Sequence, residues 1–205
     1  MPILEVHSDI WCPFAYVGIT AALEERSRRG RSDVGIVMRA WPLELVNGSP
    51  LDATTTGHHV DDLRRQVAPT LFVGFDLSTF PTTTMPALAL AASAYRRDGQ
   101  TGEAVGMALR RSLFEDGLDI SDAQNLRQVA ASWDLGQVDT SDFTAVRSDW
   151  AAGSDRGVQG SPHFFFDETD VFCPTLDIER DSAGHLLLAR NRERLNAFLD
   201  VCFSP

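Results

Sequence analysis

The sequence has no hydrophobic run that approaches the roughly 18 apolar residues of a membrane span anywhere in its 205 residues. Residues 1–6 lack a basic region and a cleavable apolar segment, so we expect no secretory signal and a cytoplasmic location. Basic residues are also few, 18 against 29 acidic ones, which leaves a net charge of −11. Such a surface repels phosphate backbones, so nucleic acid is not an expected partner, whereas a neutral or cationic substrate or a small thiol is compatible. Without an apolar span, a membrane is not an expected partner either.

Cysteine is scarce as well, and the three present are Cys12, Cys173 and Cys202. An odd number at wide spacing is typical of neither a disulfide framework nor a zinc site. His58 and His59 precede two aspartates, but adjacent histidines point apart on a helix and no third ligand has suitable spacing. We therefore expect no bound metal.

Hydrophobic residues make up 43% and charged residues 23% of the chain, which is typical of one large globular domain. Hydrophobic periodicity predicts strands near both ends of the chain and mainly helices between them. The predicted strands are 3–7, 34–41, 163–166 and 171–176. The predicted helices are 13–29, 60–66, 85–97, 102–114, 121–133, 141–152 and 191–203, with serines at the start of those from 121 and 141. Segment 47–57 is predicted to be a loop, and 179–188 fits either a strand or a loop.

Cys12 lies at the junction between the first predicted strand and the first predicted helix. Unpaired N–H groups and the positive end of the helix dipole face a sulfur at this position, which lowers a thiol pKa and creates a nucleophile. Pro13 suits the first helical turn, where its missing N–H costs nothing. Asp9 is expected either to tune or relay the proton of Cys12 or to serve as a turn residue. Trp11 and Phe14 flank the cysteine, either as an apolar rim for a substrate or as core packing.

Segment 9–18, Asp-Ile-Trp-Cys-Pro-Phe-Ala-Tyr-Val-Gly, resembles the active site of the DsbA-like branch of the thioredoxin superfamily, which reads Cys-Pro-Trp-Cys in many members. Segment 157–165 resembles the Gly-Val-x-Gly-x-Pro loop of that family, which an apolar strand follows. Segment 109–122 resembles the FrnE-like and 2-hydroxychromene-2-carboxylate isomerase-like subgroup. The resemblance implies a thioredoxin-like α/β fold with an inserted α-helical subdomain. The implied parts are 1–50 and 153–205 for the thioredoxin-like domain and 51–152 for the insertion.

The same resemblance implies a cis peptide bond before Pro162, opposite the reactive cysteine. This bond would turn the backbone of Ser161 toward an extended, thiol-bearing substrate. His163 would point either toward the sulfur, where a cationic ring favours the thiolate, or away into the sheet. His7 is expected to be structural.

The sequence departs from the family motif at position 15, where Ala15 replaces the expected second cysteine. A mixed disulfide at Cys12 must then be released by an outside thiol or by a distant cysteine. Cys173 is either that distant partner or a buried strand residue, and Cys202 is expected to pack in the last helix. No cofactor is expected to be bound, and glutathione or another low-molecular-weight thiol is the expected co-substrate.

The resemblance implies a thiol–disulfide oxidoreductase that acts through Cys12, with an external thiol as the resolving partner. One alternative is a glutathione-dependent isomerase or transferase of the 2-hydroxychromene-2-carboxylate isomerase type, in which residue 12 activates a bound thiol. Another is a non-catalytic binding scaffold, in which the pKa of Cys12 would be ordinary, about 8.5. Both a monomer and a homodimer are compatible with the sequence.

Overall fold

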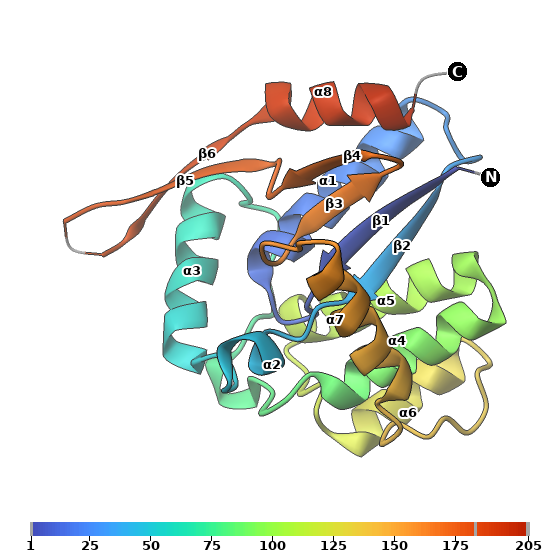
Figure 1. Cartoon of the computed structure of the whole chain (residues 1–205). Coiled ribbons are helices and arrows are strands. Elements are labelled where there is room, and N and C mark those ends of the chain that lie inside the picture. Colours follow the sequence, from blue (N-terminus) through green and yellow to red (C-terminus); the bar gives the residue numbers. More distant parts are fainter. Residues whose placement is uncertain (1, 183, 204–205) are drawn as a thin grey trace.

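The computed structural model describes residues 2–182 and 184–203, and a four-stranded sheet of order β2-β1-β3-β4 lies at its centre (Figure 1). Strand β1 runs parallel to β2, and β3 pairs antiparallel with both β1 and β4. These strands are β1 (Ile3–Ser8), β2 (Gly35–Ala40), β3 (His163–Phe166) and β4 (Thr169–Phe172). This arrangement confirms the predicted thioredoxin-like α/β fold.

One face of the sheet is covered by α1 (Pro13–Arg28) and α8 (Arg192–Cys202) (Figure 1). Helix α1 approaches closely at Gly18, where an added Cβ would lie 3.6 Å from the ring of Phe164. The same ring meets Phe198 of α8, with 6.3 Å between the two centroids. Apolar contacts of this kind fix the helix that begins at Cys12 against the sheet.

The opposite face is covered by α7 (Thr144–Asp155). A Cβ on Gly153 would lie 2.8 Å from the Nδ1 atom of His7 and 2.9 Å from the ring of Trp41. Real Cβ atoms do not come so close, so the absence of a side chain lets α7 lie directly on the sheet.

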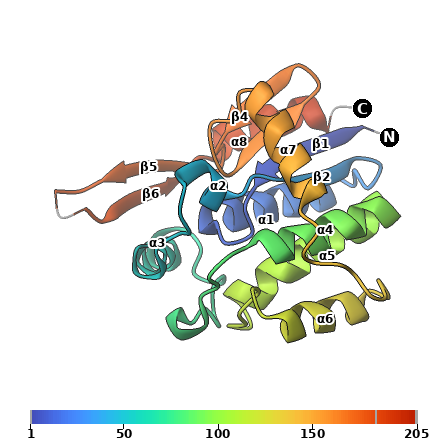
Figure 2. The ribbon, with the colours of Figure 1, turned by 60° about the horizontal axis from the view of Figure 1, so that its bottom comes forward.

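The chain between β2 and β3 contains a series of helices (Figure 2). Before α7 they are α2 (Leu43–Asn47), α3 (Ala53–Gln66), the 3-10 helix η1 (Leu77–Thr79), α4 (Met85–Arg97), α5 (Gly99–Phe114) and α6 (Ala123–Ser132). The division into 1–50, 51–152 and 153–205 stays a prediction, and α7 continues through its second boundary. No helix in the described ranges is both long enough and apolar enough to cross a membrane.

A second sheet is the hairpin of β5 (Leu176–Arg180) and β6 (Leu186–Arg190), which extends beside α3 (Figures 1 and 2). The side-chain amide of Gln66 donates to the Leu186 carbonyl at 2.8 Å and accepts from the Leu188 N–H at 2.9 Å. Gln66 therefore pairs with β6 as a neighbouring strand would. Segment 179–188 fits neither interpretation alone, because its two ends belong to β5 and β6, whereas 181, 182, 184 and 185 lie outside both strands.

Three of the predicted helix starts, those of α3, α6 and α7, are wrong, and an aspartate caps the first two of these helices. Helix α3 begins within the predicted loop, since Asp52 caps it by accepting from the Thr55 N–H at 2.7 Å. Ser121 does not cap α6; its hydroxyl donates to Asp119, and Asp122 is the N-cap. Likewise, Ser141 donates to Asp139, and α7 begins at Thr144.

The predicted strand 171–176 is also wrong, because it merges the end of β4 with the start of β5. The chain breaks from β4 at Cys173, whose φ of 42° is left-handed and incompatible with a continuing strand. Cys173 thus lies just beyond β4 rather than within it.

Candidate functional site

Cys12 is the N-cap of α1, and Pro13 occupies the first helical position. The cysteine side chain is 3% exposed, and its Sγ donates a hydrogen bond to the carbonyl of Ser161 at 3.1 Å. The backbone N–H groups of Phe14 and Ala15, in the first helical turn, favour the thiolate form of this sulfur, although the thiol makes no capping hydrogen bond with them. The structure therefore brings the two sequence motifs together at one sulfur atom.

The pKa of the Cys12 thiol is raised, against the expectation from its place at a helix N-terminus. Burial is the largest cause, because the thiolate loses its hydration, and the negative charge of Asp9 adds to the effect. The hydrogen bond with Ser161 and the N–H groups of Ala15 and Phe14 lower the pKa without outweighing burial. The predicted low pKa is thus wrong for the protein without a substrate, although the predicted helix-end donors are present.

Ser161 and Pro162 connect the elements that meet at Cys12. The peptide bond between them is cis. The Ser161 hydroxyl oxygen accepts from the Asp9 N–H at 2.9 Å, while its carbonyl accepts from Cys12. The Pro162 carbonyl accepts from the Cys173 N–H at 2.9 Å. The end of β1, the start of α1 and the end of β4 are therefore joined through two adjacent residues.

Asp9 is fully buried behind Cys12. Its carboxylate accepts from the N–H of Ile10 at 2.7 Å and from the N–H of Leu43 at 2.6 Å. Burial nevertheless raises the pKa of Asp9 to about 6, although these bonds lower it. Asp9 is thus a titratable group whose negative charge raises the pKa of the Cys12 thiol. Its backbone N–H also holds the Ser161 hydroxyl in place.

Arg110 of α5 is a further charged group behind the site, to which the sequence analysis assigned no role. It is 1% exposed and donates to the Ser8 hydroxyl at 2.8 Å and to the Asp9 carbonyl at 3.4 Å. Burial lowers its pKa to about 10, while the charges of Asp9 and Cys12 raise it. In the sequence, the one sign that Arg110 is buried is its position among apolar residues on one face of the predicted helix.

Trp11 does not form an exposed rim, which corrects one of the predicted substrate-binding roles. Its side chain is 0% exposed, and its ring stacks on Phe80 with centroids 5.8 Å apart and planes 2° apart. Phe14 is partly buried and lies 5.5 Å from the ring of His59 on α3. The rim role of Phe14 therefore stays a prediction, whereas Trp11 belongs to the core.

His163 points away from Cys12, so the structure contradicts a substrate-binding role for its ring. Its Nδ1 accepts from the Gln159 N–H at 3.1 Å, and its Nε2 lies 2.8 Å from Asp170 on β4. His163 pairs with His7 across β1 and β3, where both rings are buried on the α7 side. Burial lowers the pKa of His7 to about 4, which agrees with a structural role.

The other two cysteines have different surroundings. Cys173 is buried next to Pro162, and burial raises its pKa to about 12. Cys202 packs in α8 as expected, where its Sγ donates to the Phe198 carbonyl of the same helix at 3.3 Å. Among the described residues, no group of three or more histidine, cysteine or acidic side chains is placed to hold a metal ion.

A family model described as the DSBA-like thioredoxin domain matches residues 3–180 of the chain. No curated protein matches the chain. Among solved structures, the chain is similar to one described as a probable DsbA oxidoreductase from Streptomyces coelicolor, with a TM-score of 0.63 and 22% identity over 83% of each chain.

Two further similar structures differ in the activity for which they are named. A cytosolic disulfide reductase, DsbM from Pseudomonas aeruginosa, has a TM-score of 0.61 and 15% identity over 97% of each chain, and it has also been solved with glutathione. A 2-hydroxychromene-2-carboxylate isomerase has a TM-score of 0.58 and 16% identity over 83% of this chain and 88% of its own. At these identities the likeness shows the shared fold.

Proposed function

The chain belongs to the DsbA-like thioredoxin family, and from this premise we propose that it is a thiol–disulfide oxidoreductase that acts through Cys12. The observation that carries the proposal is the position of the Cys12 sulfur. It lies at the N-terminus of α1 and 3.1 Å from the Ser161 carbonyl. A sulfur held there meets helix-end donors on one side and a substrate-facing backbone on the other.

The proposed reaction starts when Cys12 loses its proton and attacks one sulfur of a substrate disulfide. A bond forms between the two sulfurs, the substrate S–S bond breaks, and the second substrate sulfur leaves as a thiolate. The N–H groups of Phe14 and Ala15 stabilise negative charge on Cys12 before the attack. Because the thiol then no longer occupies the Ser161 carbonyl, this acceptor can pair with an N–H of the substrate.

An external thiol returns the enzyme to its reduced form in this proposal, since Ala15 provides no second sulfur in the motif. Glutathione is the proposed thiol, and the glutathione-bound form of the structurally similar DsbM supports this choice. The cytosolic location of that reductase also supports a cytoplasmic role. The proposed substrates are protein or small-molecule disulfides.

The test is exchange between a glutathionylated model peptide and reduced glutathione, measured as peptide thiol released. We expect wild-type protein to catalyse release, Cys12→Ser to be inactive, and Cys202→Ser to remain active because its sulfur bonds within α8. Since burial raises the Cys12 pKa, the rate should still increase with pH above about 8.5, the ordinary value for a free thiol. Equal rates in wild type and Cys12→Ser would contradict the proposal.

A glutathione-dependent isomerase is the second candidate, favoured by the hydrogen-bond direction at Cys12. Here the thiol is a donor, to the Ser161 carbonyl, and a donor at this position could stabilise the thiolate of a bound glutathione. The test is the absorption spectrum of a hydroxychromene carboxylate mixed with the protein. A spectral change that requires glutathione, and that also occurs when no disulfide is present, would support this function. No change under those conditions would reject it.

A further inference from the structure

Cys173 approaches the same short segment as Cys12, from another element. The Sγ of Cys12 donates to the carbonyl of Ser161 at 3.1 Å, and the N–H of Cys173 donates to the carbonyl of Pro162 at 2.9 Å. These carbonyls belong to consecutive residues, so the start of α1 and the end of β4 place the two cysteines beside one another. Both cysteines are buried, Cys12 with 3% and Cys173 with 7% of its surface exposed.

The charge of Cys12 also acts on Cys173. After burial, the negative charge of Cys12 is the next cause that raises the pKa of Cys173. Both side chains are buried, where a low dielectric constant strengthens the interaction between charges. Once Cys12 is bound in a mixed disulfide, it carries no charge, and this obstacle to ionisation of Cys173 disappears.

The backbone at Cys173 is held in an uncommon conformation. Its φ of 42° is in the left-handed region, which disfavours side chains other than glycine, asparagine and aspartate. Arg194 of α8 fixes the turn by donating to the carbonyls of Cys173, at 3.2 Å, and of Pro174, at 3.3 Å. A cysteine kept in a costly conformation beside a reactive sulfur suggests a use for its side chain. Cys202 lacks these features, since it lies in regular helix.

We propose that Cys173 is the resolving cysteine of this enzyme, a role that rests on the proposed reaction at Cys12. Its thiolate attacks the Cys12 sulfur of the mixed disulfide. The Cys12–Cys173 bond forms, the bond from Cys12 to the substrate sulfur breaks, and the departing thiolate takes up the proton that Cys173 gave to solvent. Two molecules of an external thiol such as glutathione then reduce the internal disulfide and leave as one disulfide.

The experiment treats reduced full-length protein with one equivalent of glutathione disulfide, quenches samples over time, alkylates the remaining thiols and identifies the peptides by mass spectrometry. The chain has 18 arginines and no lysine, so cleavage after arginine puts the three cysteines in separate peptides, 1–26, 157–180 and 195–205. Wild type, Cys173→Ser and Cys202→Ser are compared, and circular dichroism checks that each variant is folded. We expect a glutathione adduct to form on Cys12 first. In wild type and in Cys202→Ser this adduct should then disappear while a disulfide link between peptides 1–26 and 157–180 appears. In Cys173→Ser the adduct should persist.

The outcomes separate this proposal from the one on which it rests. If Cys12 forms the adduct and wild type keeps it as long as Cys173→Ser does, Cys173 does not resolve it, whereas the oxidoreductase function stands. A link from Cys12 to the Cys202 peptide would also overturn the role of Cys173. If no variant forms an adduct at Cys12, both proposals fail. The link in wild type needs no variant to fold, so the central result does not depend on the stability of Cys173→Ser.

Discussion

At the scale of single residues, two buried charges act on the sulfur of Cys12 in opposite directions. The carboxylate of Asp9 raises the pKa of the thiol, whereas the guanidinium of Arg110 is stabilised by the charge of Cys12 and must in turn stabilise the thiolate. Arg110 is 1% exposed, so its charge is little screened by water. The pKa of Cys12 thus depends on charged residues that are themselves buried.

We predict that Arg110→Met moves the alkylation midpoint of Cys12 to higher pH. Methionine keeps much of the apolar volume of the side chain but removes the positive charge behind the thiolate. The measurement is the rate of iodoacetamide labelling of Cys12 against pH, read by peptide mass spectrometry with Cys202 as internal reference. Arg127→Met, at an exposed position on α6, is the matched control and should leave the profile unchanged. A midpoint that moves down in Arg110→Met would contradict the assigned role.

Asp9 also makes the stability of the fold depend on pH. Its pKa is about 6 in the folded protein against 3.8 as the ordinary value, so between these values the folded state holds a proton that the unfolded state has lost. Stability due to this group therefore falls as pH rises from about 4 to about 6, by about 3 kcal/mol in total. His7 acts in the opposite direction, since its lowered pKa of about 4 makes stability rise over the same range.

We predict that Asp9→Asn gains stability relative to wild type as pH increases from 4 to 7. Comparing the two proteins cancels the contribution of His7, which both retain. The replacement also loses an acceptor for the N–H of Ile10 or Leu43, but that cost is the same at both pH values. Urea unfolding at pH 4 and pH 7 measures the difference, and a pH-independent difference would show that the Asp9 pKa is not raised.

At the scale of helices and strands, the sequence predicted those elements whose apolar pattern is regular. Helix α4 has the predicted bounds, Met85–Arg97, and the strand β3 begins and ends as expected. The errors fall where one hydrogen bond decides the boundary, as at Asp52 and Asp122. In the Asp-x-Ser-Asp segment 119–122, both the serine and the aspartate after it can cap a helix, and the sequence alone does not show which one accepts from the helix.

The site was predictable to a similar extent. The position of Cys12 at the start of a helix follows from local sequence, and so does its approach to the 157–165 segment once the family resemblance is recognised. The direction of the thiol pKa does not, because burial of Cys12 depends on how the inserted helices close over β1. The side on which His163 points was also open, since its position in a strand fixes an alternation of faces but not which face meets α1.

The outer edge of β2 is closed by side chains rather than by another strand. Glu103 accepts from the Ile36 N–H at 3.2 Å, the Tyr95 hydroxyl from the Met38 N–H at 2.8 Å, and Asp149 from the Ala40 N–H at 3.0 Å. Unpaired edge groups would otherwise invite pairing with another chain. The helices α4, α5 and α7 thus protect the sheet edge with one polar side chain each.

We predict that Tyr95→Phe destabilises the protein by about 1–3 kcal/mol, because a half-buried strand N–H loses its acceptor. The Tyr95 hydroxyl also donates to the Ile36 carbonyl at 3.4 Å, and that bond is lost as well. Urea unfolding measures the change, and faster hydrogen exchange at the Met38 amide would localise it. Tyr16→Phe is a matched control, because it also removes a hydroxyl that forms a hydrogen bond, here to Glu115. Its expected loss of stability is smaller, since Glu115 still accepts from the Phe72 N–H. Equal losses in the two variants would contradict the edge role of Tyr95.

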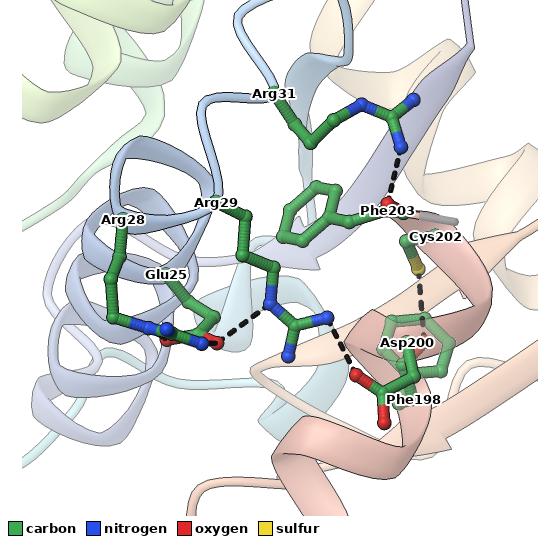
Figure 3. Close-up of polar contacts among 8 residues, drawn as sticks. All are labelled: Glu25, Arg28, Arg29, Arg31, Phe198, Asp200, Cys202 and Phe203. Atoms are coloured by element: carbon green, nitrogen blue, oxygen red, sulfur yellow. Dashed lines mark hydrogen bonds and ion pairs between the residues drawn. The ribbon is translucent and has the colours of Figure 1, made fainter. Parts of the chain in front are cut away.

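At the scale of the whole molecule, α1 begins after Cys12 and ends at a polar cluster, which Figure 3 shows. Arg29 donates to Glu25 of the same helix and to Asp200 of α8, each at 2.6 Å. Arg31 donates to the carbonyl of Phe203, directly after α8. Because α1 has 16 residues, the cluster lies about 24 Å from Cys12 along the helix.

We predict that Arg29→Ala lowers the free energy of unfolding by about 1 kcal/mol and leaves the alkylation profile of Cys12 unchanged. The side chain of Arg29 is 18% exposed and links two helices that cover the same face of the sheet. Arg28→Ala is the matched control, because Arg28 is 68% exposed and bonds to Glu25 within α1, so its loss should be smaller. Urea unfolding and the pH dependence of alkylation give the two readouts. If the pH midpoint of Cys12 alkylation shifts in Arg29→Ala, the contact between α1 and α8 affects the pKa of Cys12. The two ends of α1 would then be coupled rather than independent.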